Sequence, residues 1–166
     1  MKYILITLAL TLTAQSRNAA ELSKLLLTKE ELPKGVTFMK PESVVKPKFI
    51  KGENHVVLTD SDKLKAFCAF FLRDEGFASN FKAVSLTTCR APINEATIIG
   101  HTLQKHDGIE ALKKAYAPLT SQVTYHQYFE SGDTVMLVWC HDKEAKDYFE
   151  ALAKAVGAKL KSETKS

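Results

Sequence analysis

The sequence predicts an α+β fold, with an antiparallel sheet of the ββα-ββα type, helices packed on one face of it, and a short N-terminal helical and extended arm. Three observations lead to this prediction. The second half of the chain twice shows strand-like alternation followed by helical periodicity. A length of 166 residues is that of one domain. The 45% hydrophobic and 25% charged residues are typical of a globular protein.

The first 16 residues have the pattern of a secretory signal peptide. Lys2 is followed by an apolar run over residues 3–13, and small residues stand at positions 14 and 16, as a cleavage site requires. The run is shorter than the roughly 20 residues that span a bilayer. We therefore expect export to the periplasm or the extracellular space, with no transmembrane span after cleavage. The alternative is a buried N-terminal strand or helix of a cytosolic protein.

Residues 17–55 are predicted to form a basic N-terminal arm. Residues 18–32 have a helical composition and include a capping box at residues 28–31, and the Pro-Lys-Gly sequence at 33–35 ends any helix. From residue 36 to 52 the chain is expected to be extended and irregular. We expect an anionic surface, such as a membrane, glycan or acidic protein, to be contacted by Lys46, Lys48 and Lys51. The alternative is a solvated linker.

Residues 56–160 are predicted to form a single α+β domain, and residues 161–166 a disordered tail. A short strand at 55–58 opens this part of the chain. Residues 59–61 offer N-caps for a helix from 62 to about 74, which Gly76 is expected to end. Apolar residues at helical spacing predict one buried stripe, made of Leu64, Phe67, Cys68, Phe71 and Leu72.

The second half is predicted to contain strands at 81–89 and 95–104 and then a helix from about 108 to 117, capped by Asp107 and stopped near Pro118. Strands at 122–130 and 133–140 follow as a hairpin that turns at residues 131–133. Asp142 is expected to cap a last helix that reaches Val156, with Gly157 as its C-cap. An offset of 40 residues superposes the two ββα units, which either a duplication or a coincidence explains.

The two hairpin strands differ in the character of their faces. Residues 133–140 are apolar on both faces, which predicts a central strand covered on both sides. In residues 122–130, the apolar positions Val123, Tyr125 and Phe129 alternate with a polar and aromatic face. The candidate ligand-binding residues on that face are Thr124, His126 and Tyr128.

Motifs for nucleotide, hydrolase, zincin and EF-hand chemistry are absent, since the chain contains no GxGxxG, GxxxxGK, GxSxG or HExxH pattern. We expect no cofactor. Only three of the 23 basic residues are arginines, namely Arg17, Arg73 and Arg90. This low arginine content and the predicted export both argue against nucleic acid as a partner. The leading prediction is an exported, small, non-catalytic binding or accessory protein whose partner is a small molecule or an extracytoplasmic protein.

The alternative is a metal-binding or thiol-dependent enzyme that uses cysteine and histidine residues at strand ends. The candidate metal ligands are His101, Cys140 and His141. Cys89 or Cys140, paired with His126 or His101, would be the nucleophile and its base. Adjacent residues on a strand point to opposite faces, which weighs against an ion shared by residues 140 and 141. With three cysteines in the chain, the predicted disulfide is Cys89–Cys140, and Cys68 is expected in the core.

Overall fold

The computed structural model describes residues 18–40, 54–93 and 108–163, and residues 97–105 by their backbone. Its strands are β1 Thr37–Phe38, β2 His55–Leu58, β3 Phe81–Arg90, β4 Thr97–Lys105, β5 Tyr125–Ser131 and β6 Thr134–Cys140. Its helices are α2 Ser61–Phe71, α3 Ile109–Thr120, α4 Lys146–Glu163 and a helical stretch over 18–24, with short 3-10 helices η1 Lys29–Glu31, η3 Glu75–Asn80 and η4 Lys143–Ala145. The predicted signal peptide lies outside the described residues.

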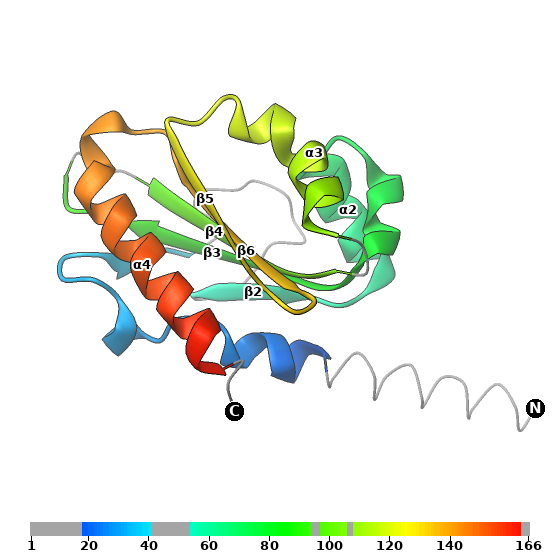
Figure 1. Ribbon diagram of the computed structural model, residues 1–166, viewed down its shortest axis with the longest axis horizontal. Helices are drawn as coiled ribbons and strands as arrows, with labels where there is room; N and C mark the ends of the chain where they lie inside the picture. The colour runs from blue at the N-terminus through cyan, green and yellow to red at the C-terminus, as the bar shows by residue number, and fades with distance from the viewer. Residues whose placement is uncertain (1–17, 41–53, 94–96, 106–107, 164–166) are drawn as a thin grey trace, which may run out of the picture.

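The strands form one antiparallel sheet in the order β1-β3-β4-β6-β5, and β2 also pairs with β3 (Figure 1). β1 and β2 share the outer edge of β3, because Thr37 pairs with Arg90 near its end while Leu58 pairs with Val84 near its middle. β4 and β6 lie side by side in the interior, with Ile99 opposite Trp139. The prediction of a mixed fold with an antiparallel sheet is confirmed, as is the interior position of β6, whose seven residues are all buried.

Helices cover both faces of the sheet, so the prediction that they pack on one face is wrong. Alternate side chains of β6 belong to two separate cores: Leu137 and Trp139 pack with α2 and α3, while Val138 and Cys140 pack with α4 and the N-terminal segment. Figure 1 shows α4 on one side of the sheet and α2 and α3 on the other. Both faces of β6 are apolar, and each face therefore requires its own cover.

The same arrangement bears on the 40-residue offset between the two ββα units. In the β4–β6 pair, Ile99 lies opposite Trp139, the register expected of a twofold axis that relates residues 40 positions apart. Such an axis, perpendicular to the sheet, would leave both helices on the same face. Leu112 of α3 and Leu152 of α4 instead belong to opposite cores. The register of the β4–β6 pair thus agrees with the 40-residue offset, whereas the positions of helices α3 and α4 do not.

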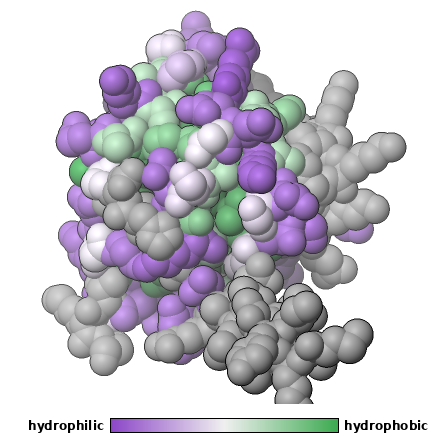
Figure 2. All heavy atoms as spheres, turned by 90° about the vertical axis from the view of Figure 1, so that its right-hand side faces the viewer, coloured by the Kyte–Doolittle hydropathy of each residue, from purple (hydrophilic) through white to green (hydrophobic). Residues whose placement is uncertain are grey.

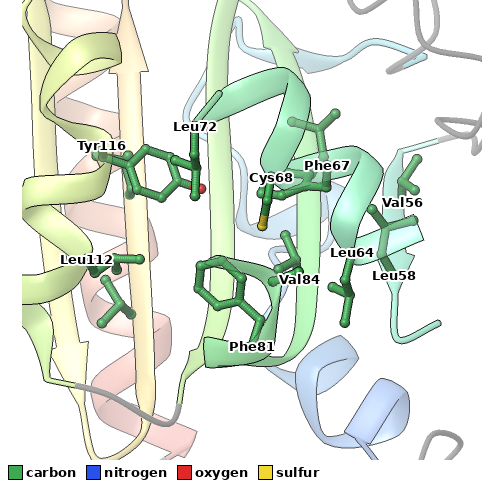
Figure 3. Packing of buried hydrophobic residues seen from close by; sticks show 14 of the residues in the cluster. Val56, Leu58, Leu64, Phe67, Cys68, Leu72, Phe81, Val84, Leu112 and Tyr116 are labelled. Atoms are coloured by element: carbon green, nitrogen blue, oxygen red, sulfur yellow. The ribbon is translucent and has the colours of Figure 1, made fainter. Parts of the chain in front are cut away.

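The first core lies between the sheet and helices α2 and α3. Figure 3 shows Leu64, Phe67 and Cys68 of α2 directed toward the strands, near Phe81 and Val84 of β3. The predicted stripe of α2 is buried at four of its five positions, and Phe71 is half-buried against Trp139, with ring centroids 6.4 Å apart. On the outer surface of α2, Phe70 is 51% exposed. Figure 2 views this side of the molecule and shows apolar residues gathered among hydrophilic ones.

The second core lies under α4, and it explains a wrong prediction at Gly157. This glycine does not end the helix, which continues to Glu163 and buries Leu160 on the way. The predicted tail at 161–166 therefore begins as helix. A Cβ atom at Gly157 would lie 2.6 Å from Cε1 of Phe129 on β5. Glycine is needed here because helix and strand approach each other closely, and not because a helix terminates.

The ends of α2 and α3 also differ from the sequence-based expectation. Asp60 caps α2 as predicted, since its carboxylate accepts hydrogen bonds from the backbone N–H groups of Asp62 and Lys63 at 3.1 Å. The reversal after α2 occurs at Arg73, with φ +56°, and not at Gly76. Helix α3 passes through Pro118 and ends at Thr120. Pro118 has no backbone N–H, so α3 lacks one hydrogen bond near its end.

The β5–β6 hairpin turns at Gly132 and Asp133, as the sequence predicts. Gly132 has φ +56°, the conformation that a two-residue hairpin turn requires at its first position. Lys82 of β3 forms an ion pair of 3.0 Å with Asp133. Among the residues that the structure describes, no helix is long and apolar enough to cross a membrane.

Candidate functional site

A hollow with a volume of about 510 Å³ lies where η1, β1 and the start of β2 meet. The turn at Gly35 shapes one wall. Its φ of +86° suits glycine, and a Cβ atom there would lie 3.1 Å from Cγ of Pro92. This turn follows η1 directly and leaves Lys34 exposed. The hollow is lined by Lys29, Leu32, Pro33, Lys34, Gly35, Val36, Thr37, Phe38 and Asn54.

His55 follows Asn54 in sequence and packs against Phe38, another residue of the lining. Its Nε2–H donates to the carbonyl oxygen of Leu27 at 3.0 Å, which leaves Nδ1 to accept a hydrogen bond from the Thr87 hydroxyl at 2.7 Å. Its ring meets the Phe38 ring edge to face, with centroids 4.9 Å apart. Burial lowers the pKa of His55, although the hydrogen bond to Leu27 acts in the opposite direction. The lowered pKa favours the neutral ring. The histidine joins the N-terminal segment to β3.

The charge on the lining is positive. Lys29, Lys34 and Asn54 are among the lining residues, and no Asp or Glu lines the hollow among the described residues. Glu31 and Glu30 are the acids nearest to these lysines in sequence. The carboxylate of Glu31 binds other groups. It accepts hydrogen bonds from the Thr28 N–H at 2.7 Å and from Lys159 Nζ at 2.9 Å, and these lower its pKa. The charge of Glu31 is thus compensated by Lys159, its ion-pair partner.

Such a lining can bind an anion. The two ammonium groups and the amide donate hydrogen bonds, and Leu32 and Phe38 add apolar surface. No imidazole, thiol or carboxylate lines this hollow within the described part of the chain. A second hollow, of about 350 Å³, lies between α2 and η3 and carries charges of both signs on Lys65, Glu75 and Lys82.

The lysines predicted to contact an anionic surface, Lys46, Lys48 and Lys51, lie outside the described residues. The segment that contains them, 41–53, connects β1 and Lys40 to Asn54. In sequence it begins three residues after Phe38 and ends directly before Asn54, two residues that line the hollow.

The three predicted ligand-binding residues share one face at the start of β5, away from this hollow. Thr124 donates a hydrogen bond to the carbonyl oxygen of His141, and His126 is exposed. The His126 and Tyr128 rings meet edge to face with centroids 5.9 Å apart. The phenolic oxygen of Tyr128 is buried without a hydrogen-bond partner among the described residues. Burial raises the pKa of Tyr128 to about 12, and the nearby Thr120 hydroxyl opposes the rise.

All three thiols are buried and free in this structure, so the predicted Cys89–Cys140 disulfide is not formed. Ile98 of β4 lies in register with both cysteines and separates their strands. Two strand spacings amount to about 10 Å, beyond the Cα separation that a disulfide spans. Burial raises the pKa of Cys68 and Cys89 to about 12 and raises that of Cys140 as well. Thiols in such surroundings are poor nucleophiles.

The alternative metal ligands do not come together along the backbone. His101 is three residues from Ile98, the register partner of Cys140, which is about 10 Å along the strand. Cys140 is buried, while His141 is exposed. Among the described side chains, no three His, Cys, Asp or Glu residues lie close enough to hold a metal ion.

Comparison with known proteins adds no relative: no family model matches the chain, and no curated protein or solved structure matches it. The site therefore rests on its own geometry. Sequence reasoning recognised the capping box and the Pro-Lys-Gly turn but not their role as walls of a hollow. That role depends on β1 and β2, which bring Phe38 and Asn54 together because both strands pair with β3. The sequence carries no local signal for this pairing.

Proposed function

We propose that this chain is an exported, non-catalytic binding protein, and that the hollow beside η1 holds an anionic group of its ligand or partner. One observation carries the proposal: Lys29, Lys34 and Asn54 surround about 510 Å³ with no carboxylate among the described lining residues. In a surface hollow, two ammonium groups attract an anion more strongly than isolated lysines do, because their fields add.

The ligand that this chemistry suits is small or narrow, with a carboxylate, phosphate or sulfate group beside an apolar part. The anionic group would accept hydrogen bonds from the two lysines and from Asn54. The apolar part would contact Phe38 and Leu32. Segment 41–53, which lies between Phe38 and Asn54 in sequence, contains further lysines.

Calorimetric titration tests the site directly, with inorganic phosphate, citrate and a sulfated disaccharide as probes at low and high salt. We expect at least one probe to bind, and the double variant Lys29→Gln/Lys34→Gln to weaken its binding about tenfold. The matched control is Lys63→Gln/Lys114→Gln, which removes the same charge from exposed positions on α2 and α3. Equal weakening by both double variants, or binding by none of the probes, contradicts the proposed site.

Export is proposed from the signal pattern at residues 1–16 and has its own test. The full-length chain is expressed in a bacterial host, and the intact mass of the exported protein is measured. A chain that begins at Arg17 supports export. Full-length protein retained in the cytoplasm, with Met1–Ser16 uncleaved, contradicts it.

A further inference from the structure

β5 is the last strand of the sheet, and its outer edge has no strand partner among the described residues (Figure 1). The opposite edge of the sheet differs, because both β1 and β2 pair with the outer side of β3. An unpaired edge presents a row of backbone N–H and C=O groups to any strand that approaches. The β5 edge is seven residues long and pairs with β6 without a shift in register.

The residues of β5 give this edge little protection, since Glu130 is the only Asp, Glu, Lys or Arg on the strand. Natural edge strands are commonly blunted by lysine, proline or a bulge. The chain has 23 lysine and arginine residues, yet Tyr125–Ser131 contains none of them and no proline. Exposed side chains on the strand are His126, Gln127 and Glu130. A strand of this composition accepts a neighbour.

The strand is also complementary to itself. When two copies of β5 pair antiparallel about an axis at Tyr128, the middle residue, all seven residues find a partner. In that register His126 lies directly opposite Glu130 of the second copy, and Glu130 opposite its His126. An imidazole N–H can donate to a carboxylate across each pair. No two like charges face each other anywhere along the strand.

We infer that a second copy of this chain binds along β5 and extends the sheet across a twofold axis at Tyr128. The axis is perpendicular to the sheet, so residues opposite one another share a face, as antiparallel pairing demands. A register moved by one residue would place apolar Phe129 opposite polar His126. These two residues point to opposite faces of the sheet, so antiparallel pairing excludes that register. The interface is isologous, with the same residues contributed by each copy.

This interface gives the polar and aromatic face of β5 a role. His126 and Tyr128, already in ring contact, become the centre of a cross-strand array in which Tyr128 faces its own copy. Helices α3 and α4 pack on opposite faces of the sheet, so the proposed axis leaves each helix on the same face as its counterpart. The partner is a second copy, because the His–Glu complementarity requires the sequence of β5 itself.

Sedimentation velocity of the intact protein over a wide range of micromolar concentration is the first test. We expect a monomer–dimer equilibrium in the wild type. His126→Glu places like charges opposite each other at two symmetric positions and should weaken the dimer about tenfold. The double variant His126→Glu/Glu130→His exchanges the two residues and should restore it. Both positions are exposed, so circular dichroism is expected to show the fold unchanged.

Cross-linking tests the register. His126→Cys and Glu130→Cys variants, mixed under mild oxidation, should form a covalent heterodimer, because the two positions are opposite each other. Either variant alone should not, because its two copies of the new cysteine lie about 13 Å apart along the strands. The native thiols are buried and do not interfere.

A protein that stays monomeric at every concentration overturns the inference, as does a dimer that His126→Glu leaves intact. A dimer that cross-links equally well in the single variants overturns the register. The anion site is separate from this interface, and Lys29→Gln/Lys34→Gln should leave the dimer unchanged. Failure of one proposal is thus distinguishable from failure of the other.

Discussion

Gly157 lies where helix α4 comes closest to strand β5. A Cβ atom at this position would be 2.6 Å from Cε1 and 2.8 Å from Cδ1 of Phe129, distances that side chains do not tolerate. Gly157 is buried in the middle of α4, where glycine is ordinarily unfavourable by about 1 kcal/mol relative to alanine. Its presence there is explained by the ring of Phe129, which occupies the space of the missing side chain.

We expect Gly157→Ala to destabilise the protein. Overpacking costs about 1–3 kcal/mol, and the better helix propensity of alanine offsets about 1 kcal/mol of this. The net loss in the free energy of unfolding should be about 1 kcal/mol, measured by urea denaturation.

The double variant Gly157→Ala/Phe129→Leu provides the control. The smaller side chain makes room for the methyl group, so the double variant should be more stable than the sum of the two single effects predicts. Strictly additive effects would show that the ring is not the obstacle.

At the scale of single elements, His55 connects the N-terminal segment to the sheet through two hydrogen bonds, to Leu27 and Thr87. The burial that lowers its pKa disfavours the protonated ring in the folded state. The unfolded chain, in which histidine has its ordinary pKa of about 6.5, then binds more protons. The contribution of the neutral ring to stability is therefore complete above about pH 6.5 and is lost as the pH falls below that value.

We expect the free energy of unfolding to decrease between about pH 6.5 and pH 5, and His55→Gln to reduce the slope of this decrease. Urea denaturation at a series of pH values measures both slopes. His141→Gln, at an exposed position, is the matched control and should retain the wild-type slope. Equal slopes in wild type and His55→Gln would show that this ring does not couple to folding.

Elements with a strong local pattern could be predicted from the sequence. The stripe of α2, the two apolar faces of β6 and the turn at Gly132 each follow from spacing within a few residues. The ends of helices were predicted less well, because tertiary contacts extend them. Leu160 draws α4 past Gly157 into the core, and Pro118 is accommodated in the last turn of α3.

At the scale of the whole molecule, the order of the strands could not be predicted. The adjacency of β4 and β6, and the coverage of both sheet faces, depend on contacts between segments far apart in sequence. Alternation shows that both faces of β6 are apolar but not which helix covers which face. The hollow has the same origin, since Lys29 and Lys34 line it together with Asn54, which is distant in sequence.

The cysteines allow a prediction about the molecule as a whole. Cys68 lies in one core and Cys89 and Cys140 in the other, and burial raises the pKa of all three. We expect none of them to react quickly with a thiol reagent in the native protein, and all three to react in guanidinium chloride. Absorbance after addition of an aromatic disulfide reagent follows the reaction.

An Ala69→Cys variant, with the new thiol at an exposed position on α2, supplies the positive control for that measurement and should react at once. A native thiol that reacts as quickly as the introduced one would favour the alternative of a thiol-dependent enzyme. A single reactive thiol in the denatured wild type, in place of three, would reveal a disulfide that the structure lacks.

The ion pair between Glu31 and Lys159 joins residues separated by 128 positions, and Figure 1 shows the N-terminal helix beside the end of α4. Closing so long a loop in an unfolded chain costs conformational entropy that an exposed ion pair, worth at most about 1 kcal/mol, does not recover. Once the sheet has formed, its strands already hold the two ends near each other, and the effective loop is short. The contact between Glu31 and Lys159 is thus a consequence of the folded sheet, and we expect it to contribute little to starting the assembly of the sheet.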